Sequence, residues 1–193
     1  MNNFYSRYGK RWLDVVLAIL LLMGLSWFIL ILLTLYVLTN QFPVFFKQER
    51  IGKDGLSFVM IKFRSLANND APLQERRFAL GDFLRATNLD ELPQLWNVLK
   101  GEMSLVGPRP LPVEYSSLLT KEQRERHLVR PGITGLAQVY GKNSISWDQK
   151  FQHDLTYVRN ITFWNDIKIL AKTVTLVLSM KRDVSLMEDK FKG

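Results

Sequence analysis

The sequence predicts an α+β fold, mostly helical with a small β-hairpin, in a monotopic membrane protein with a re-entrant helix at its N-terminus. Three observations lead to this prediction. The run from Val15 to Leu38 has no charged residue, and positive charge flanks it on both sides. Residues 45–65 alternate like two strands around a turn. Several later segments repeat apolar side chains at helical spacing.

The uncharged run is long enough to enter a bilayer, because a helix advances roughly 1.5 Å per residue and a hydrocarbon core is roughly 30 Å thick. A simple spanning helix concentrates positive charge on one side. Here Arg7 and Lys10 precede the run, and Lys47 and Arg50 follow it. A helix that enters and leaves by the same face satisfies both flanks.

Gly24, Leu25 and Ser26 lie near the middle of the run, where a glycine and a serine that bonds its own backbone favour a bend. A single-pass anchor is the alternative that this pattern leaves open. A signal peptide is less favoured, because no small-residue cleavage site follows the run. We therefore expect a membrane-associated helix over 1–40, a domain at the membrane interface over 41–180 and a polar tail over 181–193.

Local patterns predict the elements of the domain. From Phe45 to Ser65, two short strands surround a Gly-Lys-Asp-Gly turn, which is typical of a hairpin. After a polar loop we expect a helix over 73–85 and another that starts near Asp90. The pair Thr120 and Gln123 resembles a capping box, which begins a further helix.

Two more helices follow. Ser146 is placed to cap a helix with an apolar face of Trp147, Phe151, Leu155 and Val158. The last helix, near Phe163 to Met180, is interrupted by Asp166, Lys168 and Lys172. Those charges favour an amphipathic helix that lies on the membrane surface or packs on the domain. Three tryptophans are expected in the core by default, with a membrane-interface belt or base stacking as the alternatives, namely Trp96, Trp147 and Trp164.

Composition restricts the chemistry that the chain can perform. Its formal net charge of +8 favours an anionic partner such as phospholipid, nucleotide phosphate or nucleic acid. Without cysteine the chain has no disulfide, thiolate zinc site or thiol nucleophile. The two histidines, His127 and His153, have no further His or Cys nearby, which disfavours a zinc site. We expect chemistry that rests on oxygen ligands and an ion such as Mg²⁺.

Asp90 and Glu91 form an acid pair suited to phosphate chemistry. Pro93 suits only the first turn of a helix, so Asp90 is expected at or next to the helix cap. A capping aspartate is common without any other role. The free amides of a helix start also favour an ionised carboxylate and a bound phosphate, so Asp90 is able to attack phosphorus. Glu91 projects roughly 100° away on a helix and is better placed to hold Mg²⁺ beside a diphosphate than to share a glycosidic bond.

Basic residues accompany the acid pair. Arg85 lies one short loop before it, and two prolines restrict the backbone around Arg109. Arginine pairs bidentately with phosphate, which suits both positions. Lys62 and Arg64 on the expected hairpin would contact either a substrate phosphate or lipid headgroups. A solvated surface charge is the alternative for any one of these residues.

Five blocks resemble one known family, and the likeness covers the chain from about Lys10 to Met180. They read GKRWLDVVLA, FKQERIGKDGLSFVMIKFRS, FLRATNLDELPQLWNVLKGEMSLVGPRPL, VRPGITGLAQVYGKN and FQHDLTYV. The chain resembles the small monotopic phosphoglycosyl transferases of the bacterial sugar transferase family. The resemblance implies transfer of a phosphosugar from a UDP-sugar to undecaprenyl phosphate, with release of UMP. It places this first membrane step of glycoconjugate synthesis at the cytoplasmic face of the bacterial inner membrane.

The resemblance also implies roles for individual residues. Asp90 would be the nucleophile that forms a covalent phosphosugar intermediate, and Glu91 would hold Mg²⁺. The implied substrate-binding residues are Arg85, Lys62, Arg64, Pro108, Arg109 and Pro110. One position departs from the family, whose membrane helix breaks at a Ser-Pro pair, because the corresponding pair here is Ser26 and Trp27.

Two other functions are alternatives to a transferase. A membrane-anchored binding or scaffold protein with a basic lipid-facing surface would explain the charge and the apolar run, but it leaves the acid pair without a purpose. A nucleic-acid binder is not expected, because the basic residues are spread along the chain and no nucleic-acid recognition motif appears.

Overall fold

The computed structural model describes residues 4–141, 144–179 and 191. Its helices are α1 (Lys10–Gly24), α2 (Ser26–Leu38), α3 (Ala79–Thr87), α4 (Gln94–Lys100), α5 (Lys121–Arg124), α6 (Leu136–Tyr140), α7 (Trp147–Arg159) and α8 (Phe163–Leu178). Its strands are β1 (Phe45–Ile51), β2 (Ser57–Phe63), β3 (Ser104–Val106) and β4 (Gly132–Thr134), which pair into two small sheets. The predicted α+β class, mostly helical, is confirmed.

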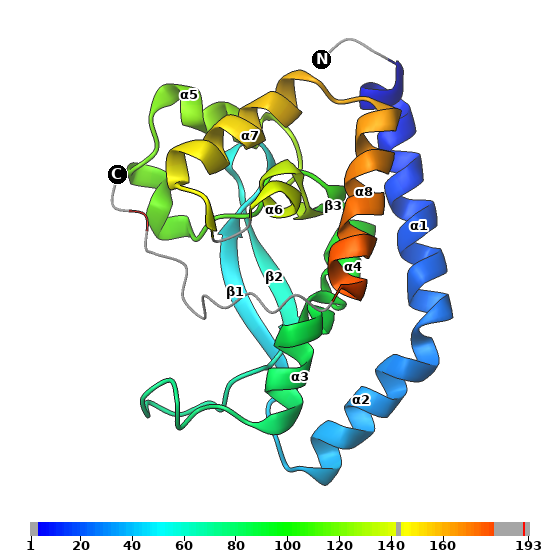
Figure 1. The fold of residues 1–193 in the computed structure, drawn as a ribbon, viewed down its shortest axis with the longest axis vertical. Coiled ribbons are helices and arrows are strands. Elements are labelled where there is room, and N and C mark those ends of the chain that lie inside the picture. Colours follow the sequence, from blue (N-terminus) through cyan, green and yellow to red (C-terminus); the bar gives the residue numbers. More distant parts are fainter. Residues whose placement is uncertain (1–3, 142–143, 180–190, 192–193) are drawn as a thin grey trace.

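The N-terminal segment forms a bent pair of helices along one edge of the molecule (Figure 1). Within the described residues, no single helix has the length and apolarity needed to cross a membrane. Tyr5–Gly24 and Ser26–Leu38 meet that test only together, with a bend of 59° between them. At the break, Ser26 Oγ donates to the carbonyl of Met23 at 2.8 Å. The bend predicted at residues 24–26 is confirmed.

The predicted hairpin is confirmed as well. β1 and β2 pair antiparallel, with a register that runs from Phe45 opposite Phe63 to Ile51 opposite Ser57. The turn at Lys53–Gly55 requires left-handed backbone, with φ of 56° at Asp54 and 78° at Gly55. Aspartate and glycine are among the residues that adopt this conformation most readily.

A second, parallel sheet was not predicted. Ser104 on β3 lies opposite Gly132 on β4, and Val106 lies opposite Thr134. The neighbouring backbones come so close that a Cβ at Gly132 would stand 2.1 Å from the amide nitrogen of Gly107. This approach fixes the start of the Pro-Arg-Pro segment, residues 108–110, which follows β3.

The helix predicted over 73–85 is wrong at its start. Residues 73–76 form a turn, and the amide of Ala67 donates to the carbonyl of Arg76 at 2.7 Å. Arg76 Nε donates back to the carbonyl of Ala67 at 3.1 Å. This reciprocal pairing folds the segment onto the preceding loop, so α3 begins only at Ala79.

Both predicted caps are present. Thr120 and Gln123 bond each other's backbone amides in a capping box at α5, and Ser146 and Gln149 do the same at α7. α7 buries the apolar face that its spacing predicted. Of the predicted core tryptophans, Trp147 packs on aromatic neighbours. The expectation is wrong for Trp96 and Trp164, which are 56% and 69% exposed on the outer sides of α4 and α8.

α8 packs beside α1 (Figure 1) through a buried carboxylate. Asp166 accepts hydrogen bonds from Tyr5 Oη at 2.6 Å, Lys10 Nζ at 2.7 Å and Tyr157 Oη at 2.8 Å. The charge that interrupts α8 thus ties the helix to the N-terminal pair. The end of the helix predicted at Met180 and most of the predicted tail lie outside the described residues, but Phe191 is buried against an aromatic cluster.

Replacing Asp166 with alanine is expected to lower the free energy of unfolding by about 3–5 kcal/mol, because Lys10 loses its ion pair and two tyrosine hydroxyls lose the carboxylate that accepts their hydrogen bonds. Denaturant unfolding in detergent, followed by circular dichroism, measures the change. Glu122→Ala is the matched control, since it removes a carboxylate from an exposed pair with Arg159 and should cost at most about 1 kcal/mol. Equal losses in both variants would contradict the assignment.

Candidate active site

The acid pair lies in a tight turn between two helices. Asn88 ends α3 in the left-handed conformation with φ of 55°, and Leu89–Glu91 form a 3₁₀ turn before α4 begins at Gln94. The prediction that Asp90 lies at or next to the cap of α4 is wrong, because Pro93, three residues on, takes the cap position with helical backbone angles. The turn, and not the end of the helix, presents the two acids.

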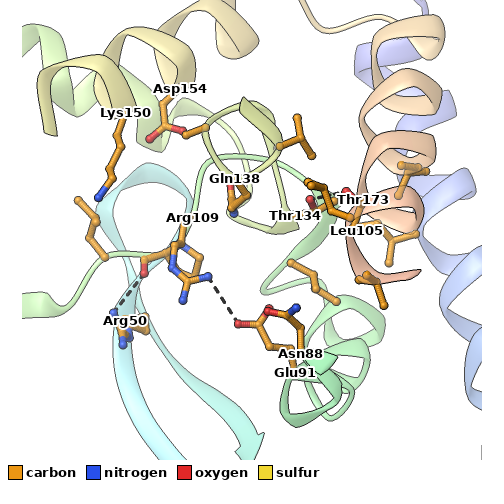
Figure 2. A pocket seen from close by; sticks show the side chains of 18 of the residues that line it. Arg50, Asn88, Glu91, Leu105, Arg109, Thr134, Gln138, Lys150, Asp154 and Thr173 are labelled. Atoms are coloured by element: carbon orange, nitrogen blue, oxygen red, sulfur yellow. Dashed lines mark hydrogen bonds and ion pairs between the residues drawn. The ribbon is translucent and has the colours of Figure 1, made fainter. Parts of the chain in front are cut away.

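Glu91 is held by two cations that come from distant parts of the chain. Lys62 Nζ on β2 lies 2.6 Å from Glu91 Oε1, and an Arg109 guanidinium nitrogen lies 3.5 Å from the same oxygen. Figure 2 shows Arg109 reaching toward Glu91 across the cavity. The structure therefore brings three of the predicted site residues together.

A buried asparagine sets the position of Lys62 relative to the acids. Asn97 on α4 donates from Nδ2 to the carbonyl of Val59 at 2.8 Å, and its Oδ1 accepts from the amide of Ile61 at 3.2 Å. These bonds attach α4 to the edge of β2. Because Lys62 follows Ile61, the same bonds fix where its side chain begins.

The two acids differ in their protonation. Burial opposes ionisation of Glu91, but the charges and hydrogen bonds of Lys62 and Arg109 outweigh it and lower the pKa of Glu91 to about 2. Burial raises the pKa of Asp90 to about 6, an effect that Lys62 opposes and that the charge of Glu91 strengthens. Glu91 therefore stays ionised in the ordinary pH range, whereas Asp90 gains its charge near pH 6.

The Pro-Arg-Pro segment buries its prolines and exposes its arginine. Pro108 and Pro110 are buried, while the Arg109 side chain is 47% exposed. All three backbone carbonyls accept hydrogen bonds. That of Pro108 accepts from the amide of Gly132 at 2.9 Å, that of Arg109 from Arg126 at 2.7 Å and that of Pro110 from Arg50 at 3.3 Å. The base of the Arg109 side chain is thereby fixed.

A buried ion pair supports this segment. Arg126 bonds Asp154 Oδ2 through two nitrogens, at 2.6 and 3.0 Å, and both side chains are almost fully buried. The other carboxylate oxygen, Asp154 Oδ1, has no hydrogen-bond partner among the described residues. Arg126 therefore links the Arg109 backbone to α7.

A cavity of about 480 Å³ adjoins the acid pair and has two unlike sides. Figure 2 shows Arg50, Arg109, Lys150 and Asp154 on one side, and Leu105, Thr134 and Thr173 on the other. The apolar residues of the wall come mainly from α1, the residues around α4 and α8, and they include Leu21, Leu25, Leu92, Leu95, Leu170, Val174 and Val177. Glu91 belongs to the wall as well.

Arg64 and Arg85 are not joined to the acids. Arg64 is buried and donates to the carbonyl of Phe42 at 3.4 Å. Arg85 pairs with Asp82 at 2.8 Å. Within the part of the chain that the structure describes, neither arginine has a hydrogen bond or ion pair with Asp90 or Glu91, so their phosphate-binding roles stay predictions.

The acid pair has too few ligands to hold Mg²⁺ alone and suits the ion only if a substrate supplies further oxygen ligands. No group of three or more metal-binding side chains occurs among the described residues. Mg²⁺ commonly takes one or two carboxylates and completes its shell with water and substrate phosphates, so this donor set suits it. Glu91 would be the ligand, together with diphosphate oxygens.

Sequence reasoning missed several residues of the cavity wall, among them Arg50, Arg126, Gln138, Lys150 and Asp154. Arg126 and Asp154 lie 28 positions apart, and no local pattern predicts such a pair. Arg50, Gln138 and Asp154 stand within blocks that carry the family resemblance, and this was the signal available for them.

Comparisons with known proteins agree with the resemblance. A family described as bacterial sugar transferase matches residues 5–180. The chain is 47% identical over 175 residues to an uncharacterized sugar transferase, EpsL, of Bacillus subtilis, which covers 88% of this chain and 87% of that protein. It is 40% identical over 189 residues to the UDP-glucose:undecaprenyl-phosphate glucose-1-phosphate transferase of Klebsiella pneumoniae, covering 89% of this chain and 40% of that protein. It is 38% identical over 196 residues to the undecaprenyl-phosphate galactose phosphotransferase of Salmonella typhimurium. That match covers 90% of this chain and 41% of that protein. The chain thus spans about two fifths of the length of the last two proteins.

Replacing Lys62 with methionine is expected to raise the pKa values of both Asp90 and Glu91, that of Asp90 by about one unit or more, because a cation that favours both carboxylates is lost. Carboxyl ¹³C NMR titration measures the shift, with Asp90→Asn to assign the signal. Lys53→Met, on the exposed hairpin turn, should leave both values unchanged. An unchanged Asp90 titration in Lys62→Met would disprove the coupling.

Proposed function

The chain belongs to the bacterial sugar transferase family, and we propose that it transfers a phosphosugar from a UDP-sugar to undecaprenyl phosphate and releases UMP. The position of the acid pair carries this proposal. Glu91, held by Lys62 and Arg109, borders a cavity that is basic on one side and apolar on the other. A diphosphate donor and an acceptor with a long hydrocarbon tail need these two environments side by side. The named activities of the Klebsiella and Salmonella proteins support the same reaction.

In the first step, a carboxylate oxygen of Asp90 attacks the β-phosphorus of the UDP-sugar. The bond between that phosphorus and the bridging oxygen breaks, so UMP leaves with the oxygen and the phosphosugar stays on Asp90. Ionised Asp90 is available above about pH 6. Lys62 and Arg109 offset the negative charge that gathers when a diphosphate meets two carboxylates.

In the second step, a phosphate oxygen of undecaprenyl phosphate attacks the same phosphorus. The bond to Asp90 breaks and the carboxylate is restored, which leaves a diphosphate linkage between lipid and sugar. Dividing the reaction in this way keeps the two anionic substrates from occupying the site together. Mg²⁺ held by Glu91 and the donor diphosphate would neutralise further charge.

We also propose that α1 and α2 enter the bacterial inner membrane from the cytoplasmic face and return to it. Their bend of 59° and the positive flanks support re-entry. The pair exposes large apolar side chains that would otherwise contact water, among them Leu20, Met23, Trp27, Leu30, Val37 and Leu38. Exposed Trp96 and Trp164 suit the depth of the lipid headgroups, where the outer face of α8 would also lie.

Detergent-purified protein given Mg²⁺, undecaprenyl phosphate and a panel of UDP-sugars is expected to release UMP. Asp90→Asn should lower the rate on the order of a thousandfold or more, because an amide cannot serve as the nucleophile. Radiolabelled UDP-sugar should also leave label on the wild-type chain and not on the variant.

Glu114→Gln, in the turn at Val113–Ser117, is the matched control and should keep full activity. UMP release that survives in Asp90→Asn would remove Asp90 as nucleophile. Failure of folded wild-type protein with every donor would instead favour the membrane-anchored scaffold.

Re-entry predicts that both flanks of the helix pair lie on the same side of the membrane. The chain has no cysteine, so single cysteines placed at Arg7 and Lys53, both exposed, report their own location. Both should react with an impermeant maleimide in inside-out vesicles and neither in intact spheroplasts, with the unaltered chain as the blank. Labelling of the Arg7 position alone in spheroplasts would show a spanning helix.

A further inference from the structure

The side-chain amide of Gln138 on α6 is unsatisfied. Neither Nε2 nor Oε1 has a hydrogen-bond partner among the described residues, and both atoms are buried. A buried donor or acceptor without a partner destabilises a folded protein, so native structures seldom keep one without a reason. Gln138 keeps a donor and an acceptor side by side.

The surrounding chain accommodates this amide closely. A Cβ at Gly135 would stand 2.7 Å from Gln138 Oε1 and 2.1 Å from the carbonyl oxygen of Gly107. Glycine at position 135 therefore leaves the space that the amide and the backbone after β3 occupy. The packing holds Gln138 against the wall of the cavity that borders Glu91.

The cavity around Gln138 suits a nucleoside diphosphate. Figure 2 shows Gln138 between Asp154 and Lys150 on one side and Arg109 on the other. Arg109 and Lys150 provide positive charge for phosphates. Trp147 and Phe151 line the same cavity, and Lys150 Nζ lies 4.4 Å from the centre of the Trp147 ring, which places its charge at this wall. A second buried acceptor without a partner, Asp154 Oδ1, belongs to the same wall.

We propose that Gln138 recognises the base of the nucleotide donor by pairing its amide with the imide edge of uracil. The amide N–H donates to a ring carbonyl, and the amide oxygen accepts the N3–H. A donor and an acceptor in one plane match that edge, and the pairing supplies both missing partners at once. This inference rests on the proposed UDP-sugar transfer and deepens it.

The first test combines a change in the protein with a change in the ligand. UDP and its 3-methyluridine analogue, which lacks the N3–H, are titrated calorimetrically into wild-type protein and Gln138→Met in detergent. Wild type should prefer UDP by about tenfold or more, and Gln138→Met should bind UDP about tenfold more weakly and largely lose the preference. Gln152→Met, at an exposed glutamine of α7, should behave as wild type.

Thermal unfolding separates recognition from a structural role. Without ligand, Gln138→Met should be at least as stable as wild type, because two unpaired polar atoms leave a buried position. With UDP, its stabilisation should be smaller than that of wild type. A ligand-free variant that is clearly less stable would show that the amide supports the fold, and would overturn the proposal.

The outcomes also separate this inference from the proposed function. Wild-type protein that binds UDP and releases UMP, while Gln138→Met keeps the full preference over the methylated analogue, would refute the role of Gln138 alone. If the affinity lost in Gln138→Met depends on the sugar of the donor and not on its base, the role of Gln138 is refuted as well. Folded wild-type protein that neither binds UDP nor releases UMP would refute the proposed function.

Discussion

Two neighbouring carboxylates in a partly buried turn are the constraint on which the rest of this structure depends. Asp90 and Glu91 repel each other when both are ionised, and burial adds to the penalty. The compensating cations come from far along the chain, Lys62 from the hairpin and Arg109 from the segment after β3. Each of the two small sheets therefore positions one of these cations. The β1–β2 hairpin delivers Lys62 through its attachment to Asn97, and the β3–β4 pair delivers Arg109 with its backbone already bonded.

The N-terminal helix pair braces the same site from outside. Arg11 on α1 donates to the carbonyls of Val98 and Leu99, at 2.6 and 3.0 Å, at the end of α4. Asp14 accepts from the amide of Leu105 on β3 at 3.0 Å, and Tyr36 on α2 donates to the carbonyl of Arg64. The helices that we propose lie in the membrane thus bond the end of α4, the middle of β3 and the segment after β2. A shift of the pair within the bilayer would be transmitted to the turn that carries the acids.

Local sequence patterns correctly predicted the features that depend only on neighbouring residues. The hairpin, the two capping boxes and the bend at residues 24–26 depend on neighbouring residues, and all of them are present. The start of α3 was misplaced because Arg76 pairs with Ala67, a contact that helical spacing does not reveal. Residue type alone did not tell which face of its helix Trp96 occupies. In the site, the acids and Arg109 were predicted from their residue types and spacing. The support from Arg126, Asp154 and Asn97 arises from contacts between distant segments and has no local signature.

The difference between the two acids assigns their roles in the proposed mechanism. A carboxylate attacks phosphorus more readily as its basicity rises, yet it must be ionised to attack at all. With a pKa raised to about 6 by burial, Asp90 is mostly ionised at neutral pH and keeps more basicity than an ordinary aspartate. Glu91, with a pKa of about 2, is a weaker base and is already engaged by two cations. Exchanging the roles would require moving Lys62 from Glu91 to Asp90, which the bonds between Asn97 and β2 oppose.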